Sequence, residues 1–106
     1  TSWTLVPSPS VTANGTQDTL SAVTALGAGD VWAVGSTLPT TQDSQTLAEH
    51  WNGTAWQIVP TTDPSAYTNV LDTVAGTAAG QSLWAAGYST SGGTPQFATL
   101  IETTSG

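Results

Sequence analysis

Lysine, arginine and cysteine are all absent from this sequence of 106 residues, and seven acidic residues leave a formal net charge of −7. Ordinary nucleic-acid binding depends on cationic side chains that neutralise phosphates, so the sequence argues against a nucleic-acid partner. The same deficit argues against docking on anionic membrane surfaces. Without cysteine there is no disulfide framework, no thiolate metal site and no cysteine nucleophile.

Long apolar runs are also missing. None approaches the roughly 20 residues that span a bilayer, so we expect no membrane insertion. The chain starts at Thr1 without an apolar leader, which favours an excised or processed piece, natural or engineered. Charged residues make up only 7% of a sequence rich in Thr, Ser, Gly and Ala. This composition is common in secreted β-rich proteins, and the length allows one small domain.

The sequence consists of two tandem repeats. Four short segments recur in the same order at offsets of 51 to 53 residues, with length changes only in the connections. We therefore divide the chain into a first repeat, 1–53, and a second repeat, 54–106. The matching segments are 3–7 with 56–60, 20–23 with 71–74, 31–35 with 83–87, and 46–49 with 99–102.

Each repeat has the pattern of β-strands, because its apolar runs are short, rich in Val, Leu, Thr and Trp, and lack a helical period. Gly and Pro residues punctuate the gaps. Asn52-Gly53 predicts a two-residue type I′ hairpin, and Asp30 is expected to cap the turn before it through its side chain. The predicted strands are 3–6, 20–26, 31–35, 46–51, 55–59 and 97–102, together with the second-repeat equivalents of 20–26 and 31–35.

A four-stranded repeat of about 40–50 residues is typical of a β-propeller blade, so we predict an all-β chain of two four-stranded blades. The motifs DVWAVG at 30–35 and EHWNGTAW at 49–56, followed by Val59-Pro60, resemble Trp-rich bacterial β-propeller blade repeats. The resemblance covers essentially the whole chain, although Thr103-Thr104-Ser105 replaces His50-Trp51-Asn52. It implies a propeller fold and an extracellular or cell-surface parent, and it implies no activity.

The strand order predicts how the fold is completed. With strands named a to d from the axis outward, the order is d-abc-d-abc, so the last blade lacks its d strand. A ring closes when the first strand of one copy completes the last blade of the next. Propellers have about 4–8 blades, so we expect a cyclic homotrimer with six blades or a homotetramer with eight, and a dimer with four is less favoured.

Candidate catalytic groups are weak. His50 is the only histidine, and its repeat equivalent is Thr103, so we expect a structural role. Glu49 and Glu102 recur on equivalent strands, too far apart for the ~5–9 Å of a glycosidase pair. The sequence contains no nucleophile elbow, no phosphate-binding glycine loop and no calcium loop. We predict that the chain is not an enzyme and holds no cofactor or metal.

Five tryptophans favour one alternative function, a carbohydrate-binding lectin with sites repeated around the ring, because sugars stack on exposed indoles. Trp3 and Trp56 are repeat equivalents, as are Trp32 and Trp84, whereas Trp51 has no counterpart. Tryptophan that recurs at strand positions is more often part of a core, and Trp32 and Trp84 are expected to fill the wider space further out from the central axis.

A ligand, if there is one, is expected on the face that carries the long connections 8–19, 36–45, 61–69 and 89–96. Carboxylate, amide and phenol groups there suit glycans or cations rather than anions. The candidate ligand-binding residues are Asp18, Gln42, Asp43, Asp63, Tyr67 and Tyr88. The function that the sequence favours is a non-enzymatic self-assembling β-propeller module of the extracellular binding or scaffold type, or an engineered fragment of one.

Overall fold

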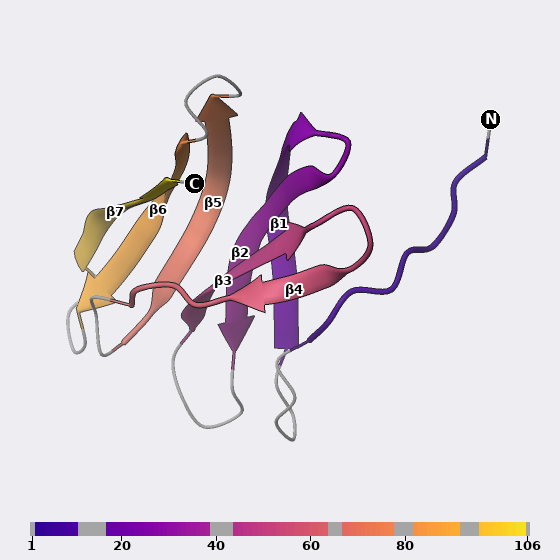
Figure 1. Ribbon diagram of the computed structural model, residues 1–106. Coiled ribbons are helices and arrows are strands. Elements are labelled where there is room, and N and C mark those ends of the chain that lie inside the picture. Colours follow the sequence, from indigo (N-terminus) through magenta and orange to yellow (C-terminus); the bar gives the residue numbers. More distant parts are fainter. Residues whose placement is uncertain are drawn as a thin grey trace.

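The computed structural model describes residues 2–10, 17–38, 44–63, 67–77, 82–91 and 96–105 (Figure 1). Within these ranges the chain is all β, and it contains no helix long and apolar enough to cross a membrane. The strands are β1 (Gln17–Gly27), β2 (Asp30–Leu38), β3 (Gln45–Trp51), β4 (Trp56–Val59), β5 (Asn69–Thr77), β6 (Ser82–Ser91) and β7 (Gln96–Ser105).

The strands form two antiparallel sheets. Sheet 1 has the order β1-β2-β3-β4 and sheet 2 the order β5-β6-β7, so every strand pairs with its neighbour in the sequence. The predicted all-β class and the meander of each repeat are confirmed. Strand β4 belongs by sequence to the second repeat but pairs with β3, so it supplies the fourth strand of sheet 1.

The two sheets lie face to face, with β5 against β1, β2 and β3 (Figure 1). Four buried side chains form the core between them, namely Val34 and Ala48 from sheet 1 and Leu71 and Ala85 from sheet 2. Small side chains let the sheets approach closely on the β5 side, where a Cβ on Gly76 would meet Leu26 of β1. The core is therefore a contact between two repeats, because neither sheet covers its own apolar face.

A glycine at the same place in each sheet marks a β-bulge. The pairing of β1 with β2 shifts register between Leu20 and Ala22, and the pairing of β5 with β6 shifts between Leu71 and Thr73. Opposite these shifts, a Cβ on Gly35 would collide with the carbonyl oxygen of Thr19, and one on Gly87 with that of Val70. Glycine is required at both positions because the neighbouring backbone occupies the space of a side chain.

The predicted two-residue hairpin at Asn52-Gly53 is wrong in length. Trp51 pairs with Trp56, so the turn between β3 and β4 contains the four residues 52–55. The Asn52 Oδ1 accepts hydrogen bonds from the backbone N–H groups of Thr54 and Ala55, at 2.9 and 3.0 Å. Gly53 alone among the described glycines has a positive φ, 98°. The side chain of Asn52 therefore stabilises a longer turn than the dipeptide predicts.

The predicted strand at 3–6 is not part of either sheet of the single chain. Residues 2–10 are extended and largely exposed, and they run away from the start of β1 (Figure 1). Trp3 and Leu5 are almost completely exposed to solvent. Sheet 2 correspondingly has three strands, and β7 pairs with β6 alone among the described strands.

Candidate functional site: two uncovered sheet faces and an open edge

Each sheet has two faces, and the repeat makes the faces of sheet 1 and sheet 2 equivalent. The leucine face carries Leu20, Val23 and Ala33 in sheet 1 and, at equivalent positions, Leu71, Val74 and Ala85 in sheet 2. The tryptophan face carries Trp32, Val34 and Ala48 in sheet 1 and Trp84, Ala86 and Ile101 in sheet 2. These assignments follow from strand register, because side chains alternate between faces and cross-strand neighbours share one.

Inside the chain, the tryptophan face of sheet 1 packs on the leucine face of sheet 2. Val34 and Ala48 contribute from the first and Leu71 and Ala85 from the second. Two faces have no described sheet of the same chain packed against them, and we call them uncovered: the leucine face of sheet 1 and the tryptophan face of sheet 2. The interface inside the chain is therefore heterologous, since it joins two different faces of the same repeated unit.

The uncovered leucine face of sheet 1 carries an apolar rim. Leu20 is 46% exposed there, whereas its equivalent Leu71 in the core is 1% exposed. Val23 and Ile58 are also exposed. The floor of this face is a depression of about 400 Å³ whose lining includes Ala33 and Glu49.

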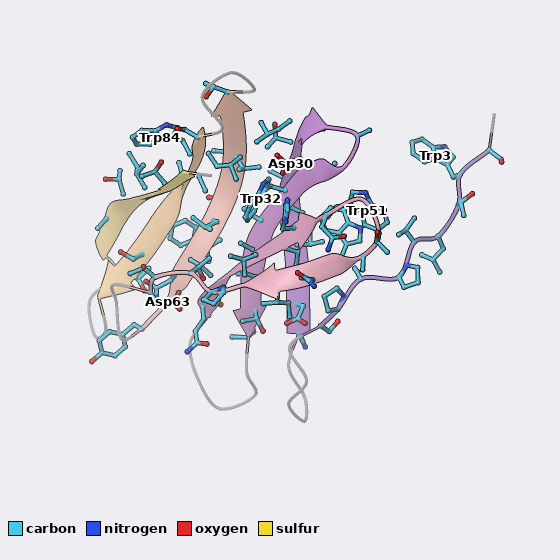
Figure 2. The ribbon with its side chains drawn as sticks, viewed as in Figure 1. Trp3, Asp30, Trp32, Trp51, Asp63 and Trp84 are labelled. Atoms are coloured by element: carbon cyan, nitrogen blue, oxygen red, sulfur yellow. The ribbon has the colours of Figure 1, made fainter. Side chains whose placement is uncertain are left out.

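The uncovered tryptophan face of sheet 2 also carries exposed apolar side chains. Ile101 is 63% exposed, whereas its equivalent Ala48 in sheet 1 is 6% exposed. Trp84 is exposed on the side of sheet 2 away from sheet 1, whereas Trp32 lines the space between the sheets (Figure 2). Trp84 was expected to fill the wider space further out from the axis, and no described strand of the single chain packs over it.

Glu49 is a buried acid on the leucine face of sheet 1. Its side chain is almost fully buried, and its Oε1 has no hydrogen-bond partner among the described residues. Burial raises the pKa of this carboxyl above its ordinary value, and the negative charge of Asp18 on the same face raises it further. Both effects shift the equilibrium of this carboxyl toward its neutral form. The sequence contains no lysine or arginine that could compensate the charge.

A cluster of polar contacts lies on the tryptophan face of sheet 1, near the β1–β2 turn (Figure 2). The Asp30 Oδ1 accepts the indole N–H of Trp32 at 3.1 Å and lies 2.8 Å from the Nε2 of His50. The rings of Trp32 and His50 stack with centroids 4.4 Å apart. Asp30 was expected to cap the preceding turn, but its described contacts are with these two side chains. His50 therefore has structural contacts, in line with its expected role.

Sheet 2 lacks this cluster because Ser82 and Thr103 stand in the places of Asp30 and His50. The Thr103 hydroxyl instead donates a hydrogen bond to the carbonyl oxygen of Leu83 at 2.7 Å. No carboxylate or imidazole is therefore provided at these two positions to hold the indole of Trp84.

A cavity of about 190 Å³ lies between the two sheets. Sheet 1 lines it with residues such as Trp32 and Val59, and sheet 2 with residues such as Leu83, Ala85 and Thr103. Thr103 belongs to β7, the strand that pairs only with β6 among those described. The cavity lining thus extends from the core to β7, whose outer edge pairs with no other described strand.

The structure describes four of the six predicted ligand-binding residues, and Gln42 and Asp43 lie outside the described residues. Asp18 and Tyr88 lie within β1 and β6, and Tyr67 immediately precedes β5 at the same end of the sheets. Asp63 has a structural contact, because its Oδ1 accepts hydrogen bonds from the backbone N–H and the hydroxyl of Thr46, at 2.7 and 2.9 Å (Figure 2). None of this tests ligand binding.

Sequence reasoning missed the hydrogen bonds that connect the segment after β4 to β3. Besides Asp63, Thr61 takes part, since the Thr46 hydroxyl lies 2.6 Å from the Thr61 hydroxyl. No local motif marks this contact, because the partners lie 15 to 17 residues apart. The uncovered faces, by contrast, could have been located from the repeat once one sheet–sheet contact was known.

No group of three or more His, Cys, Asp or Glu side chains that could hold a metal occurs in the described ranges. Comparison with protein-family models, with curated proteins and with solved structures finds no match to this chain.

Proposed function

We propose that this chain is a non-enzymatic self-assembling module whose copies stack as β-propeller blades in a closed ring. The single observation that carries the proposal is the contact between the sheets, in which a tryptophan face covers a leucine face. Each chain leaves one face of each kind uncovered, so a second copy offers the same complementary pair again. Two different faces that repeat in this way assemble into rings when the rotation closes.

The energetics favour covering these faces. Leu20, Val23, Ile58, Trp84 and Ile101 are all exposed. Burying a large apolar side chain contributes roughly 1.5–3 kcal/mol, so the faces of one interface supply several such terms. A monomer would present them to water as an aggregation-prone surface. With two sheets per chain, three or four copies complete the six or eight blades expected from the sequence.

Assembly is tested by the mass of the protein in solution, measured by light scattering on the full chain. We expect three or four times the chain mass of 10.7 kDa. A lysine on either uncovered face, Val23→Lys or Ile101→Lys, should reduce the mass to that of a monomer. Thr54→Lys is the matched control. Thr54 is exposed in the β3–β4 turn, so this substitution adds the same charge away from both faces.

Mixing the two face variants tests the heterologous geometry itself. Val23→Lys keeps an intact tryptophan face and Ile101→Lys keeps an intact leucine face. Their equimolar mixture should form dimers and nothing larger, because only one interface can form between them. A monomeric unmodified chain would refute the proposed assembly, and rings in the mixture would refute the proposed pairing of faces.

The exposed indole of Trp84 favours carbohydrate binding as a second function, since sugars stack on such rings. The two functions differ in an observable way, because ring assembly covers Trp84 and sugar binding requires it open. A glycan array on the purified protein, with Trp84→Ala as the control, separates them. Glycan binding that is lost in Trp84→Ala while the oligomer mass is kept would support the lectin. In either case we propose a secreted or cell-surface parent.

A further inference from the structure

The outer edge of β7 lies beside the cavity between the sheets, and β7 pairs with β6 alone among the described strands. We propose that residues 3–6 of a second copy bind this edge as the fourth strand of sheet 2, with Trp3 and Leu5 turned toward the cavity between the sheets. The inference rests on the proposed assembly and on the strand exchange expected from the sequence, and it adds the register of residues 3–6 and the orientation of their side chains.

The register comes from the equivalent strands of sheet 1. There β4 pairs with β3 so that Trp56 lies opposite Trp51, Ile58 opposite Glu49, and Val59 opposite Ala48. The segment at 3–6 repeats β4, and β7 repeats β3 at an offset of 53 residues. The same pairing in sheet 2 sets Thr4 opposite Thr103 and Val6 opposite Ile101. It sets Trp3 opposite Thr104 and Leu5 opposite Glu102, and these two pairs belong to the other face.

The orientation follows from the alternation of side chains along a strand. Val6 shares its face with Ile101, which lies on the uncovered tryptophan face of sheet 2. Trp3 and Leu5 therefore point to the leucine face, which is the face that lines the cavity through Leu83 and Ala85. The volume of about 190 Å³ is sufficient for one aromatic ring, since ~150 Å³ accommodates benzene.

Trp3 and Leu5 are almost completely exposed in their own chain, so neither side chain is buried by the residues that the structure describes. Val6 and Ser8 border the depression on the uncovered leucine face of sheet 1, on the far side from sheet 2 of the same chain. That face is the one that the proposed assembly gives to the tryptophan face of a neighbour's sheet 2. The segment therefore leaves the chain on the side that the proposed assembly gives to the neighbour's sheet 2.

The chain provides an internal precedent for this exchange. Strand β4 completes sheet 1, and the nine residues 60–68 then lead to β5, the first strand of sheet 2. The segment 3–6 is followed by the ten residues 7–16 before β1 begins. A connection of nearly the same length thus lets residues 3–6 complete the preceding sheet, which in a ring belongs to another copy.

Disulfide cross-linking tests the register, because the chain has no native cysteine. The variant Thr4→Cys with Thr103→Cys places the thiols opposite each other across two copies. Oxidation followed by denaturing electrophoresis should give a ladder at multiples of 10.7 kDa. The matched control is Thr4→Cys with Thr99→Cys, four residues away on the same face of β7, and it should give no ladder.

The outcomes separate this inference from the proposed assembly. A ring of unchanged mass without the ladder, or with equal ladders from both pairs, overturns the strand exchange and leaves the ring. A cross-link within one chain overturns it as well, because residues 3–6 would then reach their own sheet 2. A monomeric unmodified chain overturns the assembly first.

A second variant keeps the test decisive if the cysteines impair folding. Trp3→Ala with Leu5→Ala removes both side chains that turn toward the cavity, and Thr4→Ala alters only the opposite side of the segment. We expect the double variant to lose the ring by light scattering and the control to retain it. An unchanged ring in the double variant would overturn the inference.

Discussion

Leu20 and Leu71 occupy equivalent positions in the two repeats, yet Leu20 is 46% exposed and Leu71 is 1% exposed. Both lie on the leucine face beside a β-bulge and opposite a glycine. The difference is the neighbour: sheet 1 covers the leucine face of sheet 2, and no sheet of the same chain covers that of sheet 1. The burial of this leucine therefore depends on the contact between repeats rather than on the repeat itself.

The two sheets also differ in how they hold their central tryptophan. Trp32 donates to Asp30 and stacks on His50, whereas Trp84 has Ser82 and Thr103 at the equivalent positions. Sheet 1 thus adds polar contacts to an indole that sheet 2 already covers. In sheet 2 the indole is exposed in the single chain.

The largest expected effect is at the pair Leu20 and Leu71. Leu71→Ala should lower the free energy of unfolding by about 2–5 kcal/mol, because it opens a cavity in the core. Leu20→Ala should cost about 0.5 kcal/mol or less in an Ile101→Lys background that keeps the chain monomeric. Denaturant titration measures both. Equal costs in the monomer would contradict the comparison, and in the assembled ring the cost of Leu20→Ala should approach that of Leu71→Ala.

The bulge glycines are expected to behave alike in both sheets, because their constraint lies within the sheet. Gly35→Ala and Gly87→Ala should each lower the unfolding free energy by about 1–3 kcal/mol, since the new methyl meets a backbone carbonyl. Gly27→Ala is the control, because a Cβ there has no atom within 4 Å. A cost in only one sheet, measured by thermal unfolding, would show that the neighbouring repeat matters here too.

The polar cluster should be worth about 1 kcal/mol, because its hydrogen bonds are partly open to water. Asp30→Ala removes the acceptor for Trp32 and His50 and should lower the midpoint of thermal unfolding. Asp72→Ala makes the same charge change at an exposed position of β5 and should have little effect. Similar losses in the two variants would mean that net charge, rather than the cluster, determines the result.

The smallest expected effect is on the pH dependence of stability. The pKa of Glu49 is raised above 4.5 in the folded chain by burial and by Asp18. The folded state therefore binds its proton more tightly than the unfolded state does. Its contribution to stability is present below pH 4.5 and is lost as pH rises through the folded pKa. Glu49→Gln should remove this part of the slope in denaturant titrations between pH 4 and pH 7, and an unchanged slope would contradict it.

Much of the fold was accessible from the sequence because the repeat and the alternation of side chains are local patterns. The ends of β1, β2, β3 and β4 fall within three residues of the predicted strands. The turn at residues 52–55 was missed because the side chain of Asn52, rather than the dipeptide, determines its length. The contacts of Asp63 with Thr46 were missed because they join positions that no motif links.

The sequence by itself determined the strand order, the equivalence of the two repeats and the excess of negative charge, since these depend on residue types and spacing. Only the tertiary structure decided which face of one sheet covers which face of the other. The physical reason is that both faces of each repeat are apolar, so composition alone permits either to be buried. The direction of stacking became visible only once Val34 and Ala48 were found against Leu71 and Ala85.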